Sequence, residues 1–166
     1  MSDPLIPLSL LIFLPALATI VIALLPKSQP DLVRLVTLAV TAIVMIAVIW
    51  MALPGMTGGE VGGLQFDTSK AEMQLFSGAS WIPSFDIAYL IGVDGISFPL
   101  VVLTGVVSFF AVIASWSIKK YVKGYCILFL LLLTGMLGVF MALDFFLFYV
   151  FSVSYTHLTL PTICSV

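Results

Sequence analysis

The chain has 166 residues, of which 62% are hydrophobic and 8% are charged, and its mean hydropathy is +1.27. This composition excludes an ordinary soluble domain, in which about 45–50% of the residues are apolar. The net charge of −2 and the lack of a basic stripe argue against a nucleic-acid partner. A single histidine and two isolated cysteines, Cys126 and Cys164, argue against a metal or redox centre.

Four apolar stretches are each long enough to cross a membrane as a helix. A hydrocarbon core about 30 Å thick needs roughly 20 helical residues. The four stretches are residues 5–25, 32–53, 96–118 and 125–143. A fifth apolar stretch, residues 145–151, is too short to cross alone. The sequence therefore predicts an all-α, polytopic membrane fold with four complete spans, a truncated fifth and one long extracytoplasmic loop.

The basic residues indicate how the chain is oriented. Five of the six lie in or beside the two short connections between spans: Lys27, Arg34, Lys119, Lys120 and Lys123. The sixth, Lys70, is alone in the long connection at 54–95. By the positive-inside rule, the short connections face the cytoplasm, and the N-terminus and the long connection lie outside. We expect Arg34, in the first turn of its span, to extend its side chain to the membrane interface. The expected location is the cell inner membrane.

The long connection is the only sizeable polar region of the sequence. Its first part, PGMTGGEVGG (54–63), lacks the Lys-Ser/Thr ending of a phosphate-binding loop, so we expect a flexible turn there. Residues 81–93, WIPSFDIAYLIGV, alternate weakly and are rich in aromatic residues, which favours extended or hairpin structure at the outer interface.

A few small and acidic residues are candidates for a structural role. Gly135, Gly138 and Ala142 fall on one face of the fourth span, where another helix can approach closely. Asp94, followed by Gly95, and Asp144 lie at the outer ends of the third and fourth spans. Charges at helix ends are more often caps or interfacial anchors than proton-relay groups, so capping is the first interpretation of both. Cys126 is expected to be a small apolar filler.

Three segments carry a resemblance to a known family. YLIGVDGISFPLVVLT, KGYCILFLLLLTGMLGVFMALD and DFFLFYVF closely resemble consecutive segments of chain M, or subunit 4, of the proton-pumping NADH:quinone oxidoreductase, respiratory complex I. Chain M is one of the antiporter-like subunits of that complex. The motifs occur in the order and spacing of that family. The resemblance covers about residues 1–151, the N-terminal part of such a subunit, and is most secure over residues 81–151.

The resemblance implies a membrane-arm subunit that moves protons while NADH oxidation and quinone reduction take place elsewhere in the complex. Such a subunit binds no redox cofactor, and its partners are the lipid bilayer and the other membrane-arm subunits. In that family Phe-Tyr-Val-Phe is typically followed by Trp-Glu, and the mechanism uses this Glu and lysines of later helices. Val153 stands at the position of the Glu. We therefore expect no catalytic, cofactor-binding or metal-binding residue in this chain, and no activity of the chain alone.

We do not expect the C-terminal residues to be encoded by the natural gene. VSYTHLTLPT (153–162) resembles the translation of adapter DNA from transposase-based sequencing libraries. We expect residues 152–166 to be a non-native tail. The apolar run FFLFYVF (145–151) is then a stub of a fifth span, which should lie in the interface or pack disordered against the fourth span.

Two alternatives remain open from the residues. One is another antiporter-like chain, from a different complex I subunit or a multisubunit sodium/proton antiporter. The other is a membrane anchor or assembly protein with no transport role, which predicts a natural end after the fourth span. The DNA that follows Phe151 would distinguish them.

Overall fold

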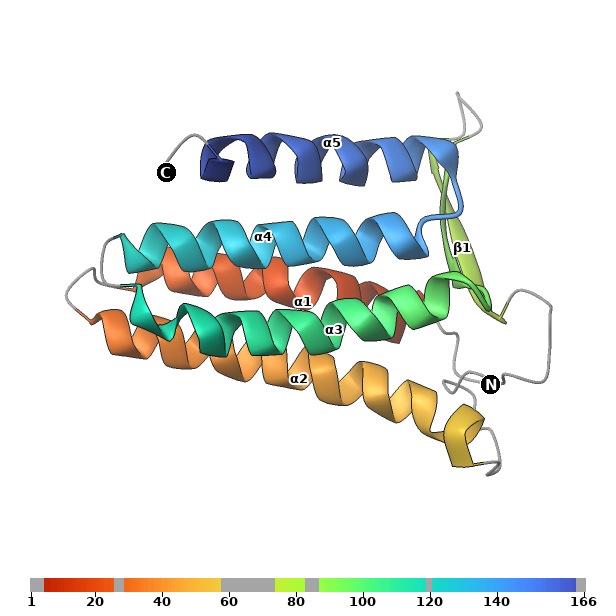
Figure 1. Cartoon of the computed structure of the whole chain (residues 1–166). Helices are drawn as coiled ribbons and strands as arrows, with labels where there is room; N and C mark the ends of the chain where they lie inside the picture. The colour runs from red at the N-terminus through yellow and green to blue at the C-terminus, as the bar shows by residue number, and fades with distance from the viewer. Residues whose placement is uncertain (1–4, 26–28, 58–73, 83–86, 119–120, 164–166) are drawn as a thin grey trace.

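The computed structural model describes residues 5–25, 29–57, 74–82, 87–118 and 121–163. Within these residues, long helices run side by side and a two-stranded hairpin lies across one end of the bundle (Figure 1). A short 3-10 turn, Ser115–Ser117, prolongs the third helix. The helices are α1 (Leu5–Leu24), α2 (Pro30–Thr57), α3 (Ser97–Ala114), α4 (Val122–Met141) and α5 (Phe145–Ile163). The all-α, polytopic fold class is confirmed.

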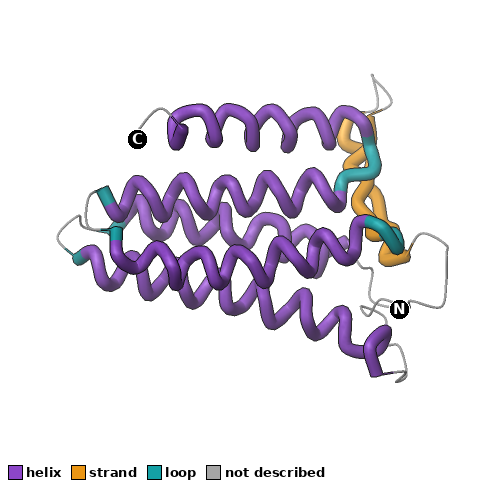
Figure 2. The backbone as a smooth tube through the Cα atoms, in the orientation of Figure 1, coloured by secondary structure: helices purple, strands orange, loops and turns teal. Residues whose placement is uncertain are grey.

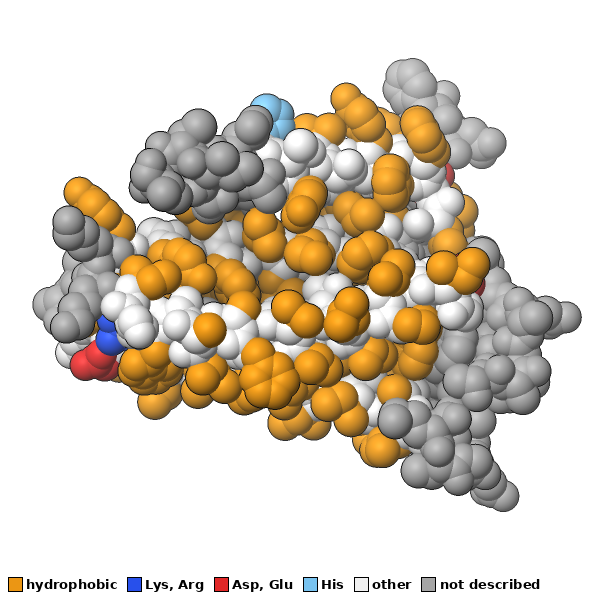
Figure 3. Space-filling model, in the orientation of Figure 1, with side chains coloured by type: hydrophobic (Ala, Val, Ile, Leu, Met, Phe, Trp, Pro, Cys, Tyr) orange, Lys and Arg blue, Asp and Glu red, His pale blue; other side chains and the backbone are white. Residues whose placement is uncertain are grey.

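The helices have the length and surface of membrane spans. Pro30–Leu53, Ser97–Ser117 and Val122–Met141 are long and apolar enough to cross a bilayer, and Leu8–Leu24 is a shorter apolar helix. Large hydrophobic side chains such as Leu35, Ile46 and Phe110 are exposed on the outside of the bundle. Figure 3 shows hydrophobic side chains over the visible face, with charged side chains only at its ends. The chain is a multi-pass membrane protein.

α4 is the central helix of the bundle. It packs against the other four helices, and its buried residues point in several directions, among them Cys126, Leu130, Leu133 and Leu137. Leu133, Leu137 and Met141 share one buried cluster with residues of α1, α2, α3 and α5, while Cys126 and Leu130 belong to a second cluster with α1 and α2. Burial of Cys126 among apolar side chains agrees with its expected role as a filler.

The hairpin consists of β1 (Gln74–Ile82) and β2 (Ile87–Val93), which pair in antiparallel register with Ser77 opposite Ile91 and Ala79 opposite Tyr89. Figure 2 shows both strands crossing the ends of the helices. The expectation of extended or hairpin structure at 81–93 is confirmed for residues 81–82 and 87–93, while residues 83–86 lie outside the described ranges. Its location at the outer interface stays a prediction. The turn expected at 54–63 is wrong for residues 54–57, which form the last turn of α2, and its remaining residues lie outside the described ranges.

α4 differs in its bounds from the predicted span at 125–143. It begins earlier, because Tyr121 adopts a left-handed conformation (φ 52°, ψ 35°) that turns the chain directly into the helix. It ends earlier, because Ala142 is extended (φ −73°, ψ 125°) and forms a β-bridge with Ile91. A pairing between residues so distant in sequence leaves no trace in hydrophobic periodicity.

The expected stub at 145–151 is also wrong in the structure, since α5 is one helix from Phe145 to Ile163. The Ser154 hydroxyl donates to the Val150 carbonyl at 2.9 Å, and the Thr156 hydroxyl donates to the Ser152 carbonyl. Hydroxyl side chains that bond to the preceding turn in this way are compatible with a helix. The non-native origin of residues 152–166 stays a prediction.

Candidate functional site

Asp94 caps the start of α3. Its carboxylate accepts a hydrogen bond from the Ser97 backbone N–H (2.6 Å) and another from the Ser97 hydroxyl, and its carbonyl accepts from the Phe98 N–H at 3.0 Å. This is the bonding pattern of an N-cap residue, although the regular helix starts only at Ser97. Gly95 follows on the surface, and a Cβ added there would meet nothing within 4 Å.

The hydrogen bonds from Ser97 also set the charge state of Asp94. The hydroxyl and the backbone N–H of Ser97 lower the pKa of the Asp94 carboxyl, because both bonds favour the charged form. The positive end of the α3 dipole favours the same form. Asp94 therefore acts as a fixed anion at a helix end, which is unsuited to a group that must take up protons near neutral pH.

Asp144 caps α5 in the same way. Its carboxylate accepts from the backbone N–H of Phe146 at 2.8 Å and of Leu147 at 3.4 Å, and its carbonyl accepts from the Phe148 N–H at 2.9 Å. The carboxylates of both Asp94 and Asp144 therefore accept hydrogen bonds from backbone N–H groups at helix starts, as the capping interpretation predicted.

A short stretch of β structure connects these two caps. The Leu143 N–H donates to the Leu90 carbonyl at 3.0 Å, and Ala142 pairs with Ile91. Asp94 directly follows β2, and Asp144 directly follows Leu143. The hairpin thus brings the starts of α3 and α5 to the same end of the bundle (Figure 1).

The face of α4 that carries Gly135 and Gly138 packs against α5. A Cβ added at Gly138 would lie 2.5 Å from the ring of Phe151, and one added at Gly135 would lie 3.3 Å from Cβ of Tyr155. Glycine at these positions lets the two helices approach more closely than any larger residue allows. Both glycines are buried in helix packing, where they leave no space for a ligand.

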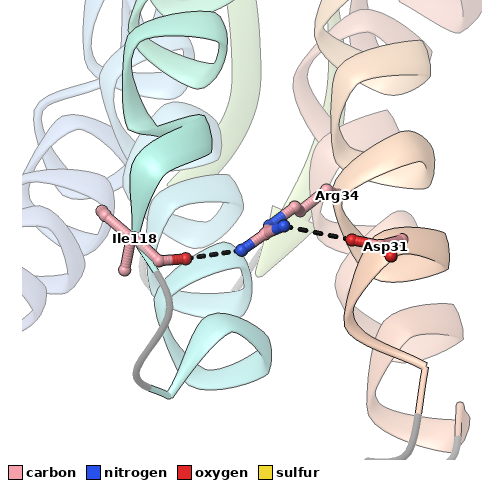
Figure 4. Close-up of polar contacts among 3 residues, drawn as sticks. All are labelled: Asp31, Arg34 and Ile118. Atoms are coloured by element: carbon pink, nitrogen blue, oxygen red, sulfur yellow. Dashed lines mark hydrogen bonds and ion pairs between the residues drawn. The ribbon is translucent and has the colours of Figure 1, made fainter.

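The opposite end of the bundle carries the described basic residues, Arg34 and Lys123. The side chain of Arg34 is only 16% exposed, and it donates to the Ile118 carbonyl at 2.6 Å and to Asp31 at 3.1 Å (Figure 4). Its expected reach to the membrane interface stays a prediction. The guanidinium also lies 5.9 Å from the ring centre of Trp116. Lys123 donates to the carbonyls of Ala23 (2.8 Å) and Leu25 (2.7 Å).

Lys123 thus caps the C-terminal end of α1, and Arg34 bonds to the backbone just past the 3-10 turn that follows α3. Cations are favoured at this end of the helix dipole, where carbonyl groups lack helical partners. Neither contact with a backbone carbonyl was predicted from the sequence. The one signal in the sequence for these contacts was that Arg34 and Lys123 each lie in the first turn of a helix, shortly after the preceding helix ends.

The interior of the bundle offers no reactive constellation among the described residues. They contain no group of three or more His, Cys, Asp or Glu side chains that could hold a metal ion. Buried hydroxyls bond within their own helix, as Thr37 does to Val33, Thr104 to Leu100 and Thr134 to Leu130. The described arrangement can hold helix ends together, and its charges lie at the ends of the spans.

Sequence comparison identifies relatives, although no family model matches the chain. The chain is 35% identical over 145 residues to the NAD(P)H-quinone oxidoreductase chain 4 3 of a Picosynechococcus strain, a match that covers 86% of this chain and 24% of the relative. Over most of its length the chain is similar to quinone oxidoreductase chain 4 proteins. It is also 35% identical over 147 residues to NADH-ubiquinone oxidoreductase chain 4 of Arabidopsis thaliana, with 87% and 27% covered.

A chloroplast relative extends the comparison. The NAD(P)H-quinone oxidoreductase chain 4 of Chara vulgaris is 31% identical over 142 residues, with 86% of this chain and 27% of the relative covered. The chain thus spans about a quarter of the length of the chain 4 relatives that it matches.

Proposed function

We propose that this chain is part of a membrane-arm subunit of an NADH:quinone oxidoreductase, of the antiporter-like type that translocates protons. The observation that carries the proposal is the match to chain 4 proteins over 86–87% of the chain. The apolar helices support it, since such a subunit must cross the bilayer. The motifs GVDGIS and DFFLFYVF point to the same family.

The role of the subunit in this proposal is transport. Electrons pass from NADH to quinone elsewhere in the complex, and this chain binds neither. Its partners are the other membrane-arm subunits and lipid. Asp94 and Asp144 belong to the scaffold, because their carboxylates already accept bonds from helix N-termini. The relay groups that the family resemblance implies are a Glu in place of Val153 and lysines of later helices.

The proposed orientation follows from the charges. The end with Arg34 and Lys123 faces the cytoplasm, and the hairpin end lies outside the inner membrane. Positive residues near short loops resist translocation, which is the physical basis of this assignment.

A chimera tests the proposed function. The aligned residues of the Picosynechococcus chain 4 are replaced by those of this chain in the cyanobacterium, and the complex is isolated from the membranes. We expect the chimeric subunit to assemble and to support NAD(P)H-driven quinone reduction with proton uptake. The relative's own segment, reinserted by the same cloning steps, is the control.

The same assay includes the 166-residue chain alone in vesicles, which should take up no protons. A chimera that is inserted in the membrane yet never joins the complex would contradict the proposal. Proton uptake by the chain alone would contradict the assignment of Asp94 and Asp144 to the scaffold.

A further inference from the structure

A short backbone path joins the starts of α3 and α5 without passing through the helices. It consists of Leu90–Asp94, at the end of β2, and Ala142–Asp144, between α4 and α5. The two segments are linked by the bond from the Leu143 N–H to the Leu90 carbonyl and by the Ile91–Ala142 bridge. We call these two segments together the β2 strap.

The strap is part of the core. The side chains of Ile91 and Val93 are fully buried and belong to the same cluster as Met141 at the end of α4 and Leu147 at the start of α5. Leu90 and Leu143, which form the hydrogen bond, are half-buried beside this cluster. A backbone donor or acceptor that loses its partner in such a place is costly, so the link resists opening.

α5 has fewer attachments than a central helix, and it lies at the edge of the bundle (Figure 1). It packs on α4 through Phe151 and Gly138, and the Phe151 ring meets that of Phe13 at a centroid distance of 6.2 Å. Its outer side is open, with Phe145 84% and Tyr149 59% exposed. The strap is therefore the contact that fixes where α5 begins.

From this geometry we propose that the β2 strap couples the starts of α3 and α5, so that a displacement of one helix start is transmitted to the other. Each end of the strap runs directly into a cap. Asp94 holds the N–H groups of α3, and Asp144 holds those of α5. Only Gly92 and Val93, both buried in β2, separate Ile91 from Asp94, and Leu143 is followed directly by Asp144. The coupling goes beyond the proposed function and does not depend on it.

The first test removes the hydrogen bond from Leu143 to Leu90. Leu143→Pro deletes the N–H donor, and the extended conformation of Ala142 (φ −73°, ψ 125°) is one that a residue before proline adopts. Leu143→Ala is the matched control, because it removes the side chain and keeps the N–H. Hydrogen exchange is measured on the 166-residue chain in lipid nanodiscs, at the capped amides of Ser97, Phe98, Phe146 and Leu147.

We expect Leu143→Pro to speed exchange at both helix starts by about tenfold, the change that follows the loss of about one buried hydrogen bond. Leu143→Ala should leave both starts close to the unsubstituted chain. Faster exchange at Phe146 and Leu147 alone, with Ser97 and Phe98 unchanged, would overturn the coupling and leave two independent caps.

A second variant covers the case in which proline prevents insertion. Ile91 and Ala142 form a pair flanked by the Leu90–Leu143 bond. The Cα atoms of such a pair lie about 4.5 Å apart, within the roughly 4.4–6.8 Å that a disulfide spans, so cysteines there are placed to form one. Ile91→Cys with Ala142→Cys is prepared in a chain carrying Cys126→Ala and Cys164→Ser. Oxidation should slow exchange at both helix starts, and reduction should reverse it. Slowing at one start only, or failure of the disulfide to form, would overturn the proposal.

Discussion

Four of the charged residues that the structure describes bond to backbone groups at or beside helix ends. Asp94 and Asp144 accept from the N–H groups that begin α3 and α5, Lys123 donates to carbonyls that end α1, and Arg34 donates to the carbonyl that follows the 3-10 turn after α3. Each charge is opposite in sign to the partial charge of the helix end that it meets, which is the favourable arrangement. Backbone groups left open at a helix end are costly near a membrane, so these side chains stabilise the bundle where the helices stop.

Replacing the carboxylate that caps α3 gives the first prediction. Asp94→Ala should lower the free energy of unfolding by about 1 kcal/mol, because the Ser97 N–H loses its acceptor. Asp94→Asn should cost less, since asparagine retains an oxygen that can cap. The measurement is chemical unfolding in mixed micelles followed by circular dichroism. Equal stability of the alanine variant and the unsubstituted chain would show that the cap contributes nothing.

The pKa of Asp94 adds a pH dependence to this prediction. Its carboxyl has a lowered pKa in the folded chain, so the charged form contributes stability above the unfolded pKa of about 3.9. That contribution is lost as the pH falls through the lower, folded pKa. The stability difference between the unsubstituted chain and Asp94→Asn should therefore be constant near neutral pH and shrink below about pH 4.

Helix packing around α4 gives a prediction at the scale of elements. Gly138→Ala places a methyl group 2.5 Å from the buried Phe151 ring, so α4 and α5 must move apart. We expect a loss of about 1–3 kcal/mol in the free energy of unfolding, as for other overpacked sites. Gly124→Ala is the control on the same helix, since its Cβ meets nothing within 4 Å. It should be neutral or slightly stabilising.

The outcome that contradicts this packing is a Gly138→Ala chain as stable as Gly124→Ala. Unfolding in mixed micelles, with both variants measured side by side, distinguishes the two results. The comparison separates the close approach of α5 from the general effect of glycine on helix stability, because both substitutions remove a glycine from α4.

The sequence predicted the elements to the extent that hydrophobic length defines them. The four spans match α1 to α4 within a few residues at most ends, and the weak alternation at 81–93 indicated the hairpin. The end of α4 was misplaced because Ala142 pairs with β2, a contact between residues far apart in sequence. The extent of α5 was missed. The polar residues after Phe151 predicted the end of a helix, but in the structure the helix continues and the Ser154 hydroxyl bonds to the preceding turn.

The candidate site was predictable only in part for the same reason. Capping by Asp94 and close packing at Gly138 follow from local spacing, and the structure places both as expected. The hydrogen bond from Arg34 to the Ile118 carbonyl was missed, because Ile118 lies 84 residues further along the chain, after the third helix. Local patterns identify what a residue can do within its own helix, and tertiary packing decides which distant group it meets.

At the scale of the whole molecule, the two ends of the bundle differ in charge. Arg34 and Lys123 lie at one end, and Asp94 and Asp144 lie at the other. Three further basic residues belong to the short connections and lie outside the described residues: Lys27, Lys119 and Lys120. By the positive-inside rule, this asymmetry predicts one direction of the bundle in a membrane, which is the orientation proposed above.

Two glycines allow this direction to be measured. Gly95 and Gly124 are both exposed, and a Cβ added at either would meet nothing within 4 Å, so cysteine should fit at each without disturbing the fold. Gly95 lies at the hairpin end, and Gly124 follows Lys123 at the basic end. In cells expressing a chain with Cys126→Ala and Cys164→Ser, each cysteine is treated with a membrane-impermeant maleimide.

Because translocating the lysine-rich connection is unfavourable, we expect Gly95→Cys to react in intact cells and Gly124→Cys to react only after the membrane is opened. Each variant serves as the control for the other, since both cysteines replace exposed glycines of the same chain. Labelling of Gly124→Cys alone in intact cells would reverse the proposed orientation and place the hairpin and the β2 strap in the cytoplasm. Labelling of both would mean that the chain inserts in two directions, in which case the basic residues do not determine its topology.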